Sequence, residues 1–561
     1  MDRRTFLRNS LTAAGALTVA ACTKSSPRSQ PATTTAARGS LAPAPRATIR
    51  MAQDAGDIGL PNPFAYSSGP GYGLMSRVYD SLVSADIRFG GPIVPWLATR
   101  FDHSSDGMTY TFDLRENVQW QDGQPLTPED VVFSFEYFAS KQSSLQLQRL
   151  LVETLPQGVS SVKATGGQTV EIRLDHPDVP FLRNVAGHFP IVPKHIWSTV
   201  DDPNSVQDTK MLVGTGPYRL ETYARGKGSY LFTANDSFFL GKPFVKRIEA
   251  SPVGDDLAAL KAGAIDAATA SGSSALTPDA LAPFRSDSAF GIQEQSGGIT
   301  GLYWNLTKGG ALADPKFHQA CAKAIDRNDL VQRLLGGNGK PGNPGYLTPD
   351  HPYYAKVEQY PFDPAGANQL LDSAGYKAAS GGTRQGPDGQ PLRFQLLALA
   401  ALAPVAEIVV GALKAIGVEL TVRSVDQFPQ VLQALSQGNY EMAAIIYGGN
   451  DTDPNILRAV FSSKSPKAFF GARGYVNPEF DDLAEKQRGA FDDGTRRQLV
   501  TRMQELVARD LPLLHLYYPT GYFIYRKAAF DQWPPKGGPD EKLVLVTGRN
   551  SNELTIRPTT G

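Results

Sequence analysis

The chain has 561 residues, and its 55 basic and 55 acidic side chains give a formal net charge of zero at pH 7. This balance excludes the strong basic excess that is typical of nucleic-acid-binding proteins. The length predicts roughly three or four domain-sized units with ample hydrophobic core. Only two cysteines are present, so we do not expect a fold that depends on disulfide bonds.

Residues 1–21 have the build of an export signal. A basic start, "RRTFLR" (3–8), precedes an uncharged apolar run that ends at residue 21. This run is shorter than the about 20 apolar residues that span a bilayer. We therefore expect a secretory signal rather than a permanent membrane helix. The paired arginines resemble the twin-arginine export signal.

Cys22 stands directly after this run, and "VAAC" (19–22) resembles a bacterial lipobox. In a lipobox the cysteine thiol receives diacylglycerol and becomes the first residue of the mature protein. The alternative is a plain signal with an incidental cysteine. Residues 22–46 are rich in Ser, Thr, Pro and Ala, a composition that cannot build a core. We interpret them as a flexible tether between a lipid anchor and a folded body.

The folded body begins to show regular patterns after residue 100. In "TYTFDL" (109–114), Tyr110, Phe112 and Leu114 alternate with polar residues and predict a strand with one apolar face. A turn at "DG" (122–123) follows. Thr127 then predicts the N-cap of a helix with Pro128 at its first position, a favoured place for proline.

Later segments continue this alternation of strands and helices. Residues 362–376 predict a helix that ends before Gly375, and residues 406–426 predict a helix followed by a strand. Cys321 recurs with alanines at helical spacing, which predicts a buried, inert thiol. In "VGTGPYRL" (213–220) we expect the glycines to supply backbone conformations that a Cβ would disfavour. Together these segments predict a mixed α/β protein.

The motifs, taken in order, resemble those of the extracellular solute-binding protein family 5, the peptide, nickel and oligosaccharide receptors of ABC importers. The strand, turn and helix start of residues 107–137 are the longest matching block. The other matching blocks are 213–220, 302–306, 319–331, 362–376 and 474–487. This resemblance covers about residues 50 to 525.

The resemblance implies an α/β, two-lobed periplasmic-binding-protein-like fold with an inserted subdomain and a hinge between the lobes. The expected boundaries are 47–75, 205–290 and 510–561 for lobe I, 76–204 for the inserted subdomain, and 291–509 for lobe II. The resemblance also implies a monomer that binds a solute between its lobes, closes over it and delivers it to ABC transporter permease subunits. No cofactor is expected.

Three stretches are candidates for contact with the solute. Tyr303, Trp304 and Asn305 follow the first expected hinge crossing, where family members place side chains in the cleft; the alternative is an ordinary core strand. In "NPFAYSSGPGYG" (62–73), Tyr66 could reach the cleft. The third stretch, "IIYGGNDTDPN" (445–455), is a strand end followed by a glycine loop, a common ligand position in α/β sheets.

Within this third stretch the candidate residues are Tyr447, Asn450, Asp451 and Asp453; the alternative is a solvated turn with its own Asx hydrogen bonds. In the peptide receptors of the resembled family, an aspartate four residues before the proline pairs with the peptide amino terminus. Asn450 occupies that position here, and an amide cannot supply the negative charge that a buried ammonium needs. Asp451 could take over the charge. An oligosaccharide therefore stays open as an alternative to a peptide.

Enzyme motifs are absent from the sequence. It contains no His-Glu-x-x-His, no Gly-x-Ser-x-Gly and no Cys-x-x-Cys, and "LGGNGKP" (335–341) lacks the first glycine and the Ser or Thr of a P-loop. We expect no metal site and no catalytic residues. A secreted hydrolase with two facing carboxylates stays open as the rival class, because the separation of such a pair is set by the fold.

Overall fold

The computed structural model describes residues 48–53, 57, 59–64, 69–85, 93–141, 156, 158–270, 277–378, 382–447, 453–464, 471–527, 530–531 and 557–558. All of them belong to one compact unit, residues 43–561. The expected signal (1–21), the tether (22–46) and Cys22 lie outside these residues. No helix in the described ranges combines the length and the apolar character needed to cross a membrane.

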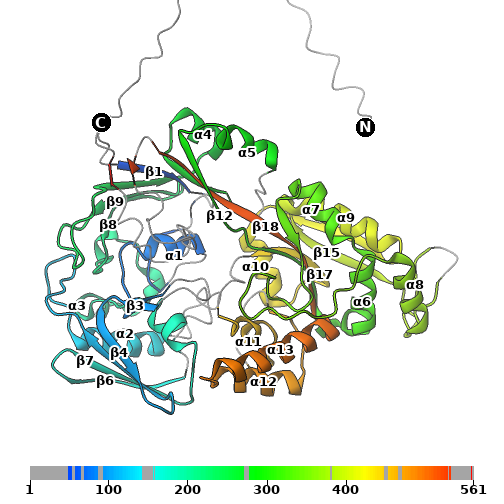
Figure 1. Ribbon diagram of the computed structural model, residues 1–561, viewed down its shortest axis with the longest axis horizontal. Helices are drawn as coiled ribbons and strands as arrows, with labels where there is room; N and C mark the ends of the chain where they lie inside the picture. Colours follow the sequence, from blue (N-terminus) through cyan, green and yellow to red (C-terminus); the bar gives the residue numbers. More distant parts are fainter. Residues whose placement is uncertain are drawn as a thin grey trace, which may run out of the picture. The chain divides into compact units, whose positions relative to one another are not determined.

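A single strand, β18 (Leu513–Arg526), joins two groups of strands into one sheet (Figure 1). The order of the main path is β16-β15-β17-β13-β18-β11-β1-β10-β9-β8, and β12 and β14 also pair with β18. The strands on one side are β1 (Thr48–Ala52), β8 (Tyr218–Ala224), β9 (Ser229–Ala234), β10 (Arg247–Ser251), β11 (Ala267–Ala270) and β12 (Phe290–Ser296). Those on the other side are β13 (Ile299–Trp304), β14 (Gly339–Pro341), β15 (Arg393–Leu399), β16 (Glu419–Val425) and β17 (Met442–Tyr447).

The chain passes between these two groups at two adjacent points. Residues 520–526 of β18 pair antiparallel with β12, and Leu513 to Tyr517 pair antiparallel with β13. Between β12 and β13 stand Gly297, whose amide donates to the Pro519 carbonyl (3.1 Å), and Gly298, whose φ is +94°. The exchange of partners therefore lies at 297–298 and 518–520. The lobe boundaries given above stay a prediction.

A separate antiparallel sheet lies within residues 76–204. Its order is β4-β5-β7-β6, with strands β4 (Ala98–His103), β5 (Thr109–Leu114), β6 (Val159–Gly166) and β7 (Thr169–Leu174). The alternation predicted for 109–114 is confirmed, because Tyr110, Phe112 and Leu114 are buried. Two short pairs complete the described strands: β2 (Val83–Ala85) with β3 (Ile93–Pro95), and β19 (Phe530–Asp531) with β20 (Arg557–Pro558).

Helices cover the sheets. Those before the sheet crossing are α1 (Gly69–Met75), α2 (Pro128–Lys141), α3 (Lys194–Trp197), α4 (Asp256–Ala262) and α5 (Pro278–Arg285). Those after it are α6 (Pro315–Ala324), α7 (Arg327–Leu335), α8 (Pro364–Ser373), α9 (Ala403–Lys414), α10 (Phe428–Gln437), α11 (Ile456–Phe461), α12 (Pro478–Arg488) and α13 (Asp493–Asp510). Short π and 3-10 turns lie at Leu182–Ala186, Pro203–Ser205, Thr209–Met211, Leu306–Lys308, Gly310–Ala313 and Ala400–Leu402.

The helix ends follow the sequence signals. At the start of α2, the Asp130 carboxylate accepts hydrogen bonds from the Thr127 amide (2.9 Å) and hydroxyl (3.0 Å), so the predicted helix start is confirmed. Gly375 follows α8 with φ +85°, as expected of a residue beyond a helix end. Cys321 is a buried free thiol on α6, so its predicted burial is confirmed, and burial raises its pKa, which disfavours the reactive thiolate.

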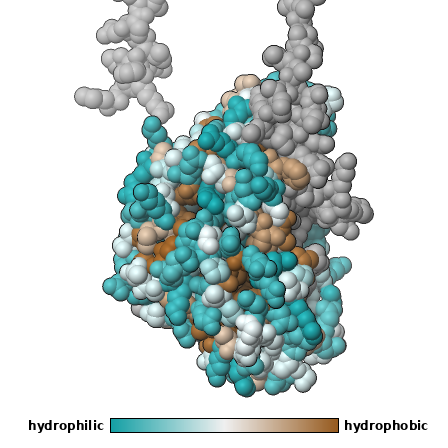
Figure 2. Space-filling model, turned by 90° about the vertical axis from the view of Figure 1, so that its left-hand side faces the viewer, coloured by the Kyte–Doolittle hydropathy of each residue, from teal (hydrophilic) through white to brown (hydrophobic). Residues whose placement is uncertain are grey.

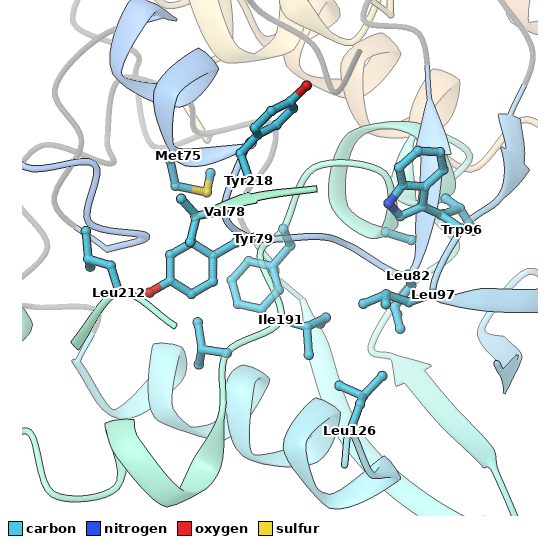
Figure 3. Packing of buried hydrophobic residues seen from close by; sticks show 14 of the residues in the cluster. Met75, Val78, Tyr79, Leu82, Trp96, Leu97, Leu126, Ile191, Leu212 and Tyr218 are labelled. Carbon is cyan, nitrogen blue, oxygen red and sulfur yellow. The ribbon is translucent and has the colours of Figure 1, made fainter. Parts of the chain in front are cut away.

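The glycines of the 213–220 block act differently from what the sequence predicted. Neither Gly214 nor Gly216 has a positive φ, so the prediction that these positions need glycine for a special backbone conformation is wrong. They instead lie directly on the chain at residues 77–79: a Cβ at Gly214 would stand 1.8 Å from the Val78 carbonyl oxygen, and one at Gly216 would stand 2.4 Å from that of Arg77. Figure 3 shows the buried apolar side chains around this contact, including Val78 and Tyr79.

This close approach predicts a large effect of one methyl group. We expect Gly214→Ala to lower the free energy of unfolding by about 1–3 kcal/mol, the usual cost of overpacking, in urea denaturation followed by circular dichroism. Gly411→Ala is the matched control, since Gly411 lies exposed in α9 with nothing within 4 Å of its Cβ position. Alanine should raise helix stability there by about 0.5–1 kcal/mol. Equal stability of the two variants would contradict the packing argument.

Candidate ligand-binding site

Tyr303, Trp304 and Asn305 lie at the end of β13, the first strand after the sheet crossing. Every residue of β13 is buried, because the strand pairs with β17 on one side and with β18 on the other. The Trp304 ring stacks on His318 of α6, with centroids 4.5 Å apart. The Asn305 side chain donates to the Gly438 (3.1 Å) and Tyr440 (2.9 Å) carbonyls. In this arrangement the three side chains are buried within the protein, and their contact with a solute stays a prediction.

Tyr447 ends β17, as the sequence predicted, and its side chain enters a buried polar cluster. Its hydroxyl lies 3.1 Å from the Tyr346 hydroxyl and 3.0 Å from His515 Nε2. The Tyr303 ring approaches it edge to face, with centroids 6.2 Å apart. Tyr303 and Tyr447 are therefore brought together, on the same side of the sheet.

The hydrogen bonds of this cluster fix the tautomer of His515. The Tyr518 hydroxyl donates to the Tyr346 carbonyl (3.0 Å) and accepts from the Asn343 amide (3.0 Å). Since its one proton is used, it accepts from His515 Nδ1, 3.0 Å away. His515 Nε2 then carries no proton and is the acceptor atom of the ring that faces the Tyr447 hydroxyl. Burial lowers the pKa of His515 to about 3, so the ring is neutral near pH 7.

Asp453 is the first described residue after the candidate loop, and it is held in a buried ion pair. Arg496 of α13 donates to both of its oxygens, at 2.6 and 3.0 Å. The Asn455 amide donates to one of them as well (2.8 Å). Gln487 of α12 accepts from Arg496 (3.1 Å) and donates to the Asn455 side chain (2.7 Å). Both carboxylate oxygens are thus satisfied within the protein.

The two ends of the candidate loop are therefore fixed by different buried networks. Tyr447 is tied to the residues of β18, and Asp453 is tied to α12 and α13. Asn450 and Asp451 lie between them, outside the described residues, and so does Tyr66. Their contact with a solute stays a prediction. In the described ranges, no group of three or more His, Cys, Asp and Glu side chains is placed to hold a metal ion.

Sequence reasoning missed several side chains of this region. His515, Tyr346 and Tyr518 were not proposed, although they form most of the polar cluster beside Tyr447. Arg496 was also missed, since Asp453 lies 43 positions away from it in the sequence. The only sequence signal was an aromatic run with a histidine, "LLHLYYP" (513–519), inside an otherwise apolar strand.

Comparison with protein families identifies the chain. The model of the bacterial extracellular solute-binding proteins, family 5, matches residues 92–469. The chain belongs to this family. Protein XP55 of Streptomyces lividans is 28% identical over 454 residues, 78% of this chain and 79% of that protein. The oligopeptide-binding protein AppA of Bacillus subtilis is 24% identical over 445 residues, 76% of this chain and 78% of AppA.

Solved structures show the same fold. AppA of Bacillus subtilis, in complex with a nonapeptide, superposes with a TM-score of 0.76 at 20% identity, covering 92% of this chain and 100% of that one. NikZ of Campylobacter jejuni, in complex with Ni(L-His), gives 0.74 at 25% identity and the same coverage. The predicted two-lobed periplasmic-binding-protein fold is confirmed.

The buried pair at the loop end predicts a marked stability effect. Asp453→Asn would leave the Arg496 guanidinium buried without a counter-charge, so we expect a loss of about 3–5 kcal/mol in the free energy of unfolding, measured by urea denaturation. The matched control is Asp482→Asn, since Asp482 pairs with Lys486 on the exposed face of α12. That variant should stay within about 0.5 kcal/mol of wild type. An Asp453→Asn variant as stable as the control would refute the structural role.

Proposed function

We propose that this protein captures an oligopeptide or a similar extended solute between its two lobes and delivers it to an ABC importer. The family assignment carries the proposal, since the matched model covers residues 92–469. AppA, whose name and structure refer to peptide binding, supports peptide as the solute class. The protein would act by binding and closure, not by catalysis.

The sheet crossing supports hinge bending. Only two strand connections, at 297–298 and at 518–520, link the two groups of strands within the described residues. Bending at a few residues lets two packed lobes move as rigid bodies. A solute that contacts both lobes then favours the closed form through its added contacts.

The candidate loop bears on the class of solute. Asn450 stands where peptide receptors of the family are expected to have an aspartate, so the loop lacks one counter-charge for a free amino terminus. An amide both donates and accepts hydrogen bonds, which suits a peptide amide or a sugar hydroxyl. An oligosaccharide is therefore the second candidate solute.

Binding can be tested with short peptides, each used in the free and the N-acetylated form. We expect at least one peptide to bind in calorimetry, to stabilise the protein by about 2.7 kcal/mol at a hundredfold excess over Kd, and to reduce the radius of gyration in X-ray scattering. Acetylation should cost less than about 2 kcal/mol, the scale of a broken charged hydrogen bond. A larger loss would restore Asp451 as an amine anchor. Binding of oligosaccharides alone would overturn the peptide as the solute, and peptide binding without compaction would overturn the closure of the lobes.

We further propose that the protein is anchored to the outer face of the cell membrane through a lipid on Cys22. The family is extracellular, and the signal and lipobox pattern at 1–22 supports an anchor there. The export route implied by the paired arginines is the twin-arginine pathway. On the face that Figure 2 shows, the apolar residues form separate small areas among polar ones.

The anchor predicts a change in cell fractionation. Cys22→Ser should move the protein from the membrane fraction to the soluble fraction without changing its melting temperature. Cys321→Ala is the control: its thiol is buried in α6, so that variant should stay with the membrane. An unmodified Cys22 in the mature wild-type protein, found by mass spectrometry, would contradict the anchor.

A further inference from the structure

Residues of the inserted subdomain touch the far lobe at a point separate from the sheet crossing. Arg488, the last residue of α12, donates to the Asp178 carboxylate at 2.7 Å, 310 positions away in the sequence. The Val179 amide donates to the Arg488 carbonyl at 2.8 Å. In Figure 1, α12 lies at the lower edge of its lobe, beside the sheet that carries β4 to β7.

Aromatic packing extends this contact. The Phe491 ring, between α12 and α13, packs on His103 of β4, with centroids 5.2 Å apart. It also covers Gly107, where a Cβ would stand 2.2 Å from a Phe491 ring atom. Phe491 stays 42% exposed and so packs at the rim of the contact, whereas the Asp178 and Arg488 side chains are each only 8% exposed.

The Arg488 end of the contact is held by the network at the candidate site. Gln487, its neighbour in the chain, hydrogen-bonds Arg496, which pairs with Asp453. The Gln487 carbonyl also accepts from Arg496 (3.2 Å). The backbone at 487–488 is thus fixed by the same arginine that fixes the residue following the candidate loop. On the other side, the Tyr110 hydroxyl donates to the Asp178 carbonyl (2.9 Å).

In the Asp178–Arg488 pair, the attraction between the two charges is roughly offset by the cost of removing them from water. Among the described residues, the other oxygen of Asp178 is buried and has no hydrogen-bond partner. Burial raises the pKa of the Asp178 carboxyl above its ordinary value, against the opposing effect of the Arg488 charge. A buried pair with a single hydrogen bond does not fully recover the desolvation of its charges. When the lobes separate, both side chains regain water.

We propose that Asp178 and Arg488 form a latch between the lobes that exists only in the closed form and sets the affinity for solute. The inference rests on the proposed closure of the lobes, and it assigns an affinity-determining role to residues outside the candidate loop. Because the pair alone is near balance, the solute decides when the latch closes. Removing one partner leaves the other buried without a counter-charge in the closed form only.

The test measures closure with and without solute. His103→Cys and Phe491→Cys are placed together in the Cys22→Ser chain, and their cross-linking by a short bismaleimide reports lobe closure without any solute. In this background we expect Arg488→Met to slow cross-linking at least tenfold. In the protein with native His103 and Phe491, Arg488→Met should weaken peptide binding at least tenfold. Its melting temperature without solute should stay within about 2 °C of wild type.

Two matched variants complete the design. Asp178→Leu added to Arg488→Met replaces the pair by apolar side chains and should restore cross-linking and binding to within about threefold of wild type. Lys486→Met, two positions earlier on α12 and exposed, should change neither. The latch would be overturned if the Arg488→Met variant cross-linked at the wild-type rate. It would also be overturned if the double variant were as impaired as the single one. If no peptide binds the wild type, the proposed function fails, and cross-linking still decides the latch.

Discussion

The continuity of β18 is the constraint on which the rest of the structure depends. One end of this strand pairs with β13 and β14, and the other pairs with β11 and β12. Both lobes therefore use the same strand as part of their core sheet, and neither can be completed without it. The antiparallel pairing of β12 with β18 leads straight to Gly297, where a Cβ would stand 2.4 Å from the Pro519 carbonyl oxygen. Side-chain-free backbone at this point lets the two chain segments pass each other closely.

This narrow crossing determines where contacts between the lobes can matter. Rotation about a short axis moves distant residues furthest, so a contact far from the axis discriminates best between open and closed forms. Arg488 ends α12, and Figure 1 shows α12 at the lower edge of its lobe, well away from β18 and the crossing. Its neighbour Gln487 belongs to the network of Arg496 and Asp453, so the arrangement of α12 and α13 links the loop end to the latch through packed, hydrogen-bonded groups.

Local chemistry made much of the fold predictable from sequence, and long-range contacts limited the prediction. The start of α2, the end of α8 and the alternation in β5 depend on neighbouring residues, and all were predicted. The role of Gly214 was not, because it depends on Val78, which no local pattern connects with it. The same holds for the candidate site: the strand end at Tyr447 was predicted, whereas its partner His515 comes from β18, 68 positions away. From the sequence alone, the aromatic residues of β13 fit a place in the cleft and a place in the core equally well, because their packing depends on which strands flank them.

The two buried arginine–aspartate pairs show how a similar interaction can serve permanent and reversible contacts. Arg496 and Asp453 lie in one lobe, and both oxygens of that aspartate accept hydrogen bonds from the guanidinium. Loss of either member of such a pair strongly destabilises the folded protein, and the two side chains never have to separate while the protein stays folded. Asp178 receives one hydrogen bond from Arg488, and its other oxygen is buried without a hydrogen-bond partner among the described residues. A contact that must open in every transport cycle cannot be as complete as the first pair, because a fully satisfied latch would hold the lobes closed without solute. Incomplete hydrogen bonding at the moving contact is thus the physical condition for closure that depends on solute.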